Sequence, residues 1–217
     1  TGTLNGLSMY RTTLNVQSNA LLTLLGKTSV GDAQADALSA INVNGGTLAC
    51  SNQLWVYNGG NASTSVLTMT SGNIFARDYF SIGNSGSGQG CGIFNMSGGY
   101  LETFGFVWIG NSGASRAVAN ISGGRWFSKV DIDVGHSAWT VGLINLSGGE
   151  VETAAGKNLY IANRAAGNNN HASTGTVAMT GGRLTLNGAD MYIGVASNGL
   201  GRCYFGGTSE ADVRNCY

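Results

Sequence analysis

A glycine corner recurs along this chain at a nearly constant spacing, and no other feature restricts the possible folds as strongly. The corner glycines are Gly46, Gly72, Gly99, Gly124, Gly149 and Gly182. Neighbouring corners are 26, 27, 25, 25 and 33 residues apart. A fixed period of this length is typical of repeat architectures, in which one small structural unit is stacked many times.

Apolar residues occupy the same positions around each corner, including degenerate copies near the two ends. Three residues before the corner stand Val16, Val43, Met69, Met96, Ile121, Leu146, Met179 and Phe205. Two residues after it stand Leu21, Leu48, Ile74, Leu101, Trp126, Val151 and Leu184. A third apolar position follows about ten residues after the corner and precedes Gly and usually Asn, as in Ile82-Gly83-Asn84. The residues between alternate in polarity, which indicates half-buried strands, and the repeated Asn predicts an amide ladder.

A unit this short cannot bury its apolar face alone, so it must stack on its neighbours. Stacking in register, with strands about 4.8 Å apart, gives parallel sheets wound into a solenoid. The sequence therefore predicts an all-β parallel β-helix (β-solenoid) of about eight coils of roughly 25 residues, as one domain over residues 1–217. Irregular coils are expected at 1–18 and 203–217, and an insertion loop at 163–175. A β-propeller blade needs roughly 40–50 residues, which the spacing excludes.

The composition agrees with this fold and excludes several classes of protein. The chain has 36 glycines and no proline, as expected where every strand N–H needs a ladder partner. Eleven basic residues balance 11 acidic ones, so no nucleic-acid partner is expected. No apolar run approaches the roughly 18–20 residues of a membrane helix, so no membrane span is expected. Cysteine spacing of the zinc-binding type is missing, and neither a metal nor a cofactor is predicted.

The repeat resembles a known group of proteins. The run Asn95-Met-Ser-Gly-Gly-Tyr-Leu101, preceded by Ile82-Gly-Asn84, is similar to the β-strand repeats of autotransporter passenger domains and related giant bacterial surface proteins. The resemblance extends from about Leu14 to Phe205. It implies a right-handed coil in an extracellular or cell-surface location. In that group, such β-helices serve as adhesins, stalks and fibres, and some of them carry enzymes.

Both ends of the chain fall partway through a coil. Residues Leu4–Tyr10 match Leu186–Tyr192 at five of seven positions, which places Thr1 just after a missing corner. Neither end has the pattern of a capping helix. Three interpretations stay open: a piece of a longer solenoid, a monomer whose end side chains cover the core, or copies that stack end to end. Stacking is favoured because an open coil end is a sheet edge, and a non-closing head-to-tail contact generates filaments.

The densest group of potential catalytic side chains is Lys129, Asp131 and Asp133. Strand alternation places all three on one outward face, with the two aspartates about 6.5–7 Å apart. This separation suits the carboxylate pair of an inverting glycosidase. Polygalacturonase-like β-helices also carry an Arg-Ile-Lys motif and further aspartates, which this chain lacks. We therefore expect no enzyme, with a polysaccharide lyase or glycosidase as the alternative.

Outward aromatic residues form two sets. The first precedes the third apolar position and consists of Tyr10, Trp55, Trp108, Tyr160 and Tyr192. The second, on the neighbouring face, consists of Phe75, Tyr100 and Phe127. Exposed aromatic stripes stack on sugars or pack against proteins, although ordinary cross-strand pairs also place aromatic residues in this way. Near the end of the chain, Cys203 and Cys216 are candidates for a disulfide.

These features predict a secreted or cell-surface structural or adhesive β-solenoid. It is expected to be a filament or sheath subunit that associates with itself end to end. The alternative is a β-helix that binds or degrades a polysaccharide along its aromatic face.

Overall fold

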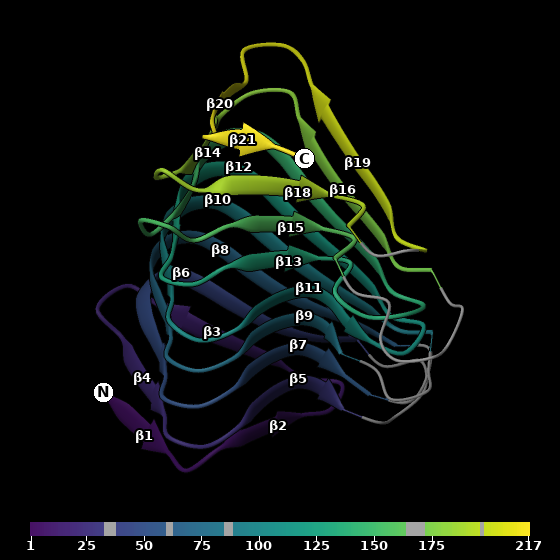
Figure 1. Cartoon of the computed structure of the whole chain (residues 1–217). Coiled ribbons are helices and arrows are strands. Elements are labelled where there is room, and N and C mark those ends of the chain that lie inside the picture. Colours follow the sequence, from purple (N-terminus) through teal and green to yellow (C-terminus); the bar gives the residue numbers. More distant parts are fainter. Residues whose placement is uncertain (33–37, 60–62, 85–88, 164–171, 196–197) are drawn as a thin grey trace.

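The computed structural model describes residues 1–32, 38–59, 63–84, 89–163, 172–195 and 198–217, and its regular structure in these ranges is entirely β-strand (Figure 1). The strands are β1 (Gly2–Leu4), β2 (Leu7–Met9), β3 (Thr13–Gln17), β4 (Leu21–Leu24), β5 (Thr28–Asp32), β6 (Leu38–Cys50), β7 (Leu54–Asn58), β8 (Thr64–Ala76), β9 (Phe80–Asn84), β10 (Cys91–Thr103), β11 (Val107–Ser112), β12 (Arg116–Ser128), β13 (Ile132–Val134), β14 (Val141–Thr153), β15 (Leu159–Ile161), β16 (Thr174–Met179), β17 (Arg183–Leu186), β18 (Asp190–Ile193), β19 (Leu200–Phe205), β20 (Glu210–Asp212) and β21 (Asn215–Cys216).

The strands form two parallel sheets whose neighbouring rungs come from successive coils. Sheet A has 12 strands and runs from β1 through β4, β6, β8, β10, β12, β14 and β16 to β19, with β3, β17 and β20 attached. Sheet B has nine strands, in the order β2-β5-β7-β9-β11-β13-β15-β18-β21. Seven turns, from β3 to β18, lie between the end coils β1–β2 and β19–β21. The predicted parallel β-solenoid is confirmed, with a number of turns close to the eight expected.

Five strands of 13 residues, β6, β8, β10, β12 and β14, bend at the repeated glycine corner. Gly124 at one such corner has a φ of 79°, and a Cβ there would lie 2.7 Å from the backbone carbon of Gly98 in the preceding coil. Glycine is therefore required both for the left-handed conformation and for the close approach of two coils. The bend divides sheet A into two arms. The first arm contains β3, β16, β19 and the N-terminal halves of the bent strands; the second contains β1, β4, β17, β20 and the C-terminal halves.

The inward side chains of the two arms and of sheet B fill one continuous core that extends from Met9 to Met191. At its centre, Phe80 of sheet B, Phe94 of the first arm and Trp126 of the second arm are all fully buried. Their ring centroids are 5.6 to 6.1 Å apart in edge-to-face contacts. The three walls of the solenoid therefore pack directly against one another, with side chains filling the interior.

The apolar positions predicted around the corner are buried in the central coils, but one residue of the first coil is misplaced. Leu22, and not Leu21, pairs with the core residue Leu48. Leu21 pairs with Thr47 and is exposed. Because Leu21 and Leu22 are both leucine, the sequence pattern alone cannot choose between them; the register of β4 on β6 does.

The sequence match aligns residues of the first strands with those of β17–β18. In the ladder, however, the first strands are shifted by two residues relative to that match. Met9 is buried and pairs with Val30, so that Ser8 takes the outward position in this column. The column continues from Ser8 through Ser29 to Trp55, and Tyr10 does not belong to it. The expectation for Tyr10 is therefore wrong, because burial of Met9 sets the register of β2.

Stacked asparagines reinforce the ladders on the outer surface. The side-chain amides of Asn120 and Asn145 each donate to the preceding asparagine of their column at 2.9 Å, starting from Asn95. A second ladder follows the third apolar position, where Asn84 donates to Asn58 at 3.0 Å and Asn111 to Asn84 at 3.2 Å. The predicted amide ladder is therefore present, and it ends where His136 replaces asparagine in the next coil.

Candidate functional site

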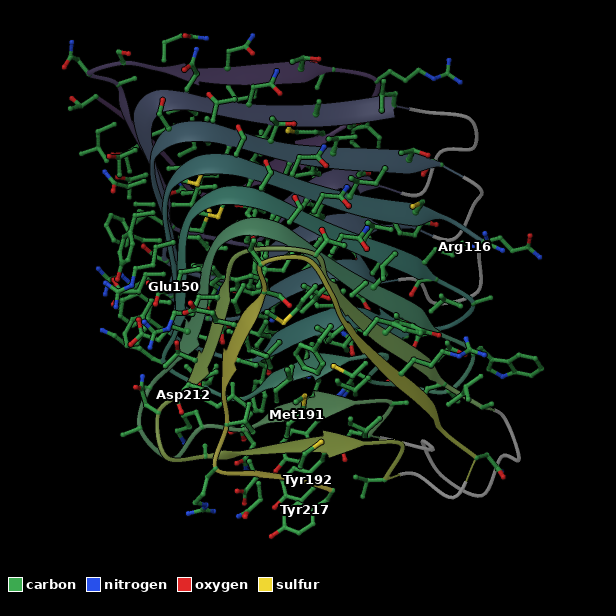
Figure 2. The ribbon with its side chains drawn as sticks, turned by 90° about the horizontal axis from the view of Figure 1, so that it is seen from above. Arg116, Glu150, Met191, Tyr192, Asp212 and Tyr217 are labelled. Carbon is green, nitrogen blue, oxygen red and sulfur yellow. The ribbon has the colours of Figure 1, made fainter. Side chains whose placement is uncertain are left out.

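The first aromatic set lies on the outward face of sheet B, in one column of successive rungs. From β5 to β18 the column reads Ser29, Trp55, Ser81, Trp108, Asp133, Tyr160 and Tyr192. Tyr160 and Tyr192 are stacked at 5.0 Å, and Tyr192 stacks on Tyr217 at 5.2 Å. Viewed from the C-terminal end, Tyr192 and Tyr217 lie together on the outer side of sheet B, while Met191 lies on the inner side (Figure 2). The predicted line of aromatic residues is therefore present from Trp55 onward.

Trp108 is the centre of an aromatic cluster that the sequence reasoning missed in part. Its ring contacts Tyr79 at 5.0 Å and stacks on Phe106 at 5.2 Å. His136 lies against Trp108 at 4.9 Å. Tyr79 and Phe106 occupy the same position in successive coils, immediately before β9 and β11. That repeated position is the sequence signal that could have revealed them, and Phe106 is the most exposed of the cluster at 56%.

Asp133 interrupts the aromatic column, and two neighbouring side chains contact its carboxylate. His136 Nδ1 lies 3.2 Å from Asp133 Oδ2, and the side-chain amide of Asn163 donates to Asp133 Oδ1 at 3.1 Å. His136 takes the position of a ladder asparagine, so both it and Asn163 are diverted from the ladder toward Asp133. A repetitive fold does not require these departures, and their convergence on one carboxylate marks the place as a candidate site.

A shallow groove surrounds this carboxylate on the outer face of sheet B. One part of it, about 270 Å³, is lined by Phe106, Trp108, Asp131, Asp133, His136, Tyr160 and Asn163. The adjoining part, about 290 Å³, shares Phe106 and both aspartates and adds Gly105, Val107, Val130 and Lys157. We call both parts together the sheet B groove. It combines flat aromatic surface with hydrogen-bonding groups, which is the combination that recognises a sugar ring.

The structure keeps Asp131 and Asp133 in this groove but separates Lys129 from them. Lys129 Nζ pairs with Glu102 at 2.8 Å and lies 4.1 Å from the ring centroid of Phe104, on the second arm of sheet A. The expectation of one shared face is wrong for Lys129, because β12 ends at Ser128 and the chain turns before β13. Asp131 accepts the backbone N–H of Asn158 at 2.7 Å, so one of its oxygens holds the next coil in place.

The second aromatic set lies on the second arm and is split between two columns. Phe75 and Phe127 both pair with Glu102, whereas Tyr100 stands in the adjacent column. Cations cover the phenylalanines, with the Arg77 guanidinium 5.7 Å from the Phe75 centroid and Arg125 5.5 Å from that of Phe127. On this face the aromatic rings therefore belong to a charged surface.

Alternating charges continue along the second arm. Arg125 pairs with Glu150 at 3.4 Å and also with Glu152, and Arg183 follows Glu150 in the ladder. Burial raises the pKa of Glu152, but hydrogen bonds from Arg125 and Asn187 outweigh it, so that the net shift is downward. This network of ion pairs stabilises the fold modestly.

Trp55 occupies the aromatic column but lies apart from the sheet B groove. The fully buried Ser81 stands between it and Trp108 in the ladder, and Lys27 Nζ lies 3.9 Å from the Trp55 ring centroid. Trp55 is therefore a useful reference for an aromatic residue in the same column that does not line the groove.

All four cysteines are free thiols in the structure, and a disulfide between Cys203 and Cys216 stays a prediction. Burial raises the pKa of Cys50 to about 12. Burial also raises the pKa of Cys203 to about 11, with a further contribution from the nearby Cys216. Cys203 and Cys216 lie in β19 and β21, both in the last coil of the solenoid.

Comparison with family models, with curated proteins and with solved structures gave no match. The fold itself defines the class of protein, a parallel β-solenoid. Within the described ranges, no helix is long and apolar enough to cross a membrane. Most of the predicted insertion loop, residues 164–171, lies outside the described residues.

Proposed function

We propose that this chain is an extracellular structural β-solenoid that associates with copies of itself through its coil ends. The observation that carries the proposal is the pair of open ends. Among the described strands, β1, β2 and β3 at one end, and β19, β20 and β21 at the other, each pair with a neighbouring strand on one side only. Unpaired parallel edges of this kind are templates for further strands. The extracellular location rests on the resemblance of the repeats to bacterial surface proteins.

The two ends offer matching apolar columns. Val16 at the first end and Phe205 at the other belong to one inward column of the first arm. Leu7 and Cys216 likewise belong to one inward column of sheet B. Phe205 is 51% exposed, so a second copy that continued the columns would bury apolar surface as well as complete the ladders.

Strand count limits how the copies can meet. A second copy in register would place its β1 on β20 and its β2 on β21. Its β3 would then lie two rungs from β19, because the partial coil β1–β2 has no strand in the first arm. The expected junction is therefore continuous in sheet B and in the second arm, with room for one additional strand in the first arm.

Electron microscopy and sedimentation of the purified chain over a range of concentrations test the proposal. We expect rods longer than one solenoid, and their loss in Phe205→Glu and Leu4→Glu, which place charge at opposite ends. Phe106→Glu is the matched control, because Phe106 is similarly exposed, at 56% against 51% for Phe205, but lies on the side of the solenoid. Single short rods at every concentration, or equal disruption by the control, would refute end-to-end association.

A second candidate function is the binding of a polysaccharide in the sheet B groove. It is supported by the convergence of His136 and Asn163 on Asp133, which the repeat does not require, between the aromatic rings of Trp108 and Tyr160. Sugar rings stack on aromatic faces. Their hydroxyl groups donate hydrogen bonds to carboxylates, and they both donate to and accept from side-chain amides.

Affinity electrophoresis in gels containing soluble polysaccharides tests this candidate. Retardation that is lost in Trp108→Ala and Tyr160→Ala, and kept in Trp55→Ala, would support binding in the groove. Release of reducing ends that is abolished by Asp131→Asn or Asp133→Asn would extend the function to cleavage. If all three aromatic variants were retarded as the unaltered chain is, the groove would be excluded as the binding site.

A further inference from the structure

Two sulfur atoms meet at the C-terminal end of the core, and the strand ladder places a third beside them. Cys203 Sγ in the first arm lies 4.0 Å from the thioether sulfur of Met191 in sheet B. Cys216 is the direct ladder partner of Met191 on the last rung of sheet B. Cys203 belongs to the same inward column as Phe94, and Met191 to the same inward column as Phe80. Phe94 and Phe80 face each other deeper in the core, with ring centroids 5.6 Å apart. The fold therefore places Cys203 opposite Met191.

The position of Cys216 follows from the parallel ladder. Paired residues in register point their side chains in the same direction, and neighbouring strands are about 4.8 Å apart. Met191 is buried and points into the core (Figure 2). Cys216, its ladder partner, therefore points toward the same space one rung further on.

We propose that Cys203, Cys216 and Met191 bind one soft monovalent metal ion, Cu(I), through three sulfur ligands. Thiolate and thioether sulfur are the donors that select Cu(I) among biological metals. Three sulfurs in a plane around a metal at about 2.3 Å stand about 4.0 Å from one another. The 4.0 Å separation of the Cys203 and Met191 sulfur atoms matches one edge of that triangle without any movement of the backbone.

The surroundings suit such an ion. Met191 is buried, Cys203 is half-buried and Cys216 is exposed, so the site has an apolar floor and an entry path from the coil end. On binding, each thiol releases its proton to solvent, and one Cu(I) with two thiolates and a neutral thioether carries a single negative charge. Zinc prefers four ligands in a tetrahedron, and the described residues contain no group of three or more His, Cys, Asp and Glu side chains that could hold it.

The test is a titration of the fully reduced chain with Cu(I) under anaerobic conditions, in competition with a colorimetric Cu(I) chelator. We expect one equivalent to be withheld from the chelator, and X-ray absorption to show sulfur ligands alone at about 2.3 Å. Cys203→Ser and Cys216→Ser should release the ion to the chelator. Met191→Leu, which preserves volume, should weaken retention while leaving the thermal transition unchanged.

Cys91→Ser is the matched control, because Cys91 lies at the start of β10, far along the stack from the last coil. It should retain the ion as the unaltered chain does. No retention by the reduced chain, or equal loss in Cys91→Ser, would overturn the proposal. Thiol counting on unreduced protein supplies a further check: a disulfide between Cys203 and Cys216 that forms as the protein is purified would also overturn it.

Discussion

Replacement of Trp126 by alanine is the sharpest test of how the coils are held together. The Trp126 side chain is fully buried, and its ring meets Phe80 at 5.7 Å and Phe94 at 6.1 Å. Truncation of a buried tryptophan costs about 3–5 kcal/mol, within which each lost edge-to-face contact accounts for about 0.5–1.5 kcal/mol. The indole N–H donates to Thr103 Oγ1, which keeps its own hydrogen bond to Ser128, so no buried donor is left unpaired.

The consequence should be larger than a uniform loss of stability. The three rings come from β9, β10 and β12, which belong to successive coils, and a solenoid is stabilised mainly by contacts between neighbouring coils. A loss of about 3–5 kcal/mol is a large part of the roughly 5–15 kcal/mol that stabilises a typical domain. We therefore expect Trp126→Ala to uncouple the two halves of the stack, so that unfolding proceeds in two steps.

Urea unfolding followed by circular dichroism, together with hydrogen exchange of β10 and β12, measures both effects. Trp55→Ala is the control, since this tryptophan is half-buried on the outer face of sheet B against Lys27, and its removal should cost only about 1 kcal/mol. If the two variants differed by less than about 1 kcal/mol, or if Trp126→Ala unfolded in one step with unchanged exchange in β10, the core would not couple the coils as described.

Three further perturbations address the corner, the ladder and the last coil. Gly124→Ala should destabilise the fold by clearly more than the roughly 1–2 kcal/mol cost of positive φ, because its Cβ would meet the preceding coil at 2.7 Å. Gly156 is the control, because it has a φ of 73° but open space around it. In the same urea assay, Gly156→Ala should show the conformational cost alone. Asn120→Ala removes two side-chain hydrogen bonds of 2.9 Å and should cost about 1–2 kcal/mol, measured by thermal unfolding; no change would mean that water replaces the ladder. Hydrogen bonds from Arg214 lower the pKa of Asp190, so the stabilisation is present above the ordinary carboxyl pKa of about 3.9 and is lost as pH falls through the folded value. Melting curves between neutral and acidic pH should show this loss, and Arg214→Ala should reduce it; an unchanged pH dependence in that variant would contradict the assignment.

The central coils could be predicted from the sequence because their pattern is local. Met96, Leu101 and Ile109 are buried as expected, since alternation along a strand fixes which side chains face inward. The regular Asn positions likewise predicted ladders that the structure contains. The first coil was harder: with Leu21 and Leu22 both apolar, only pairing with β6 decides which one enters the core.

The candidate site could be predicted only in part. Asp131, Asp133, Trp108 and Tyr160 were identified as outward residues, and they do line one groove. Lys129 was assigned to the same face because the strand was expected to continue past Ser128, but the chain turns there. The sequence also gave no sign that His136 would leave the asparagine ladder for Asp133, because this contact depends on side-chain directions around a corner.

What the amino-acid sequence determined by itself is the solenoid: period, glycine corners and inward columns all follow from local geometry repeated many times. What only the tertiary structure decided is how residues from different coils meet. The grouping of Asp133 with Asn163, and of Cys203 with Met191, joins positions 30 and 12 residues apart. These contacts depend on the register between rungs and on the facing of the walls across the core, which no spacing along a single strand specifies.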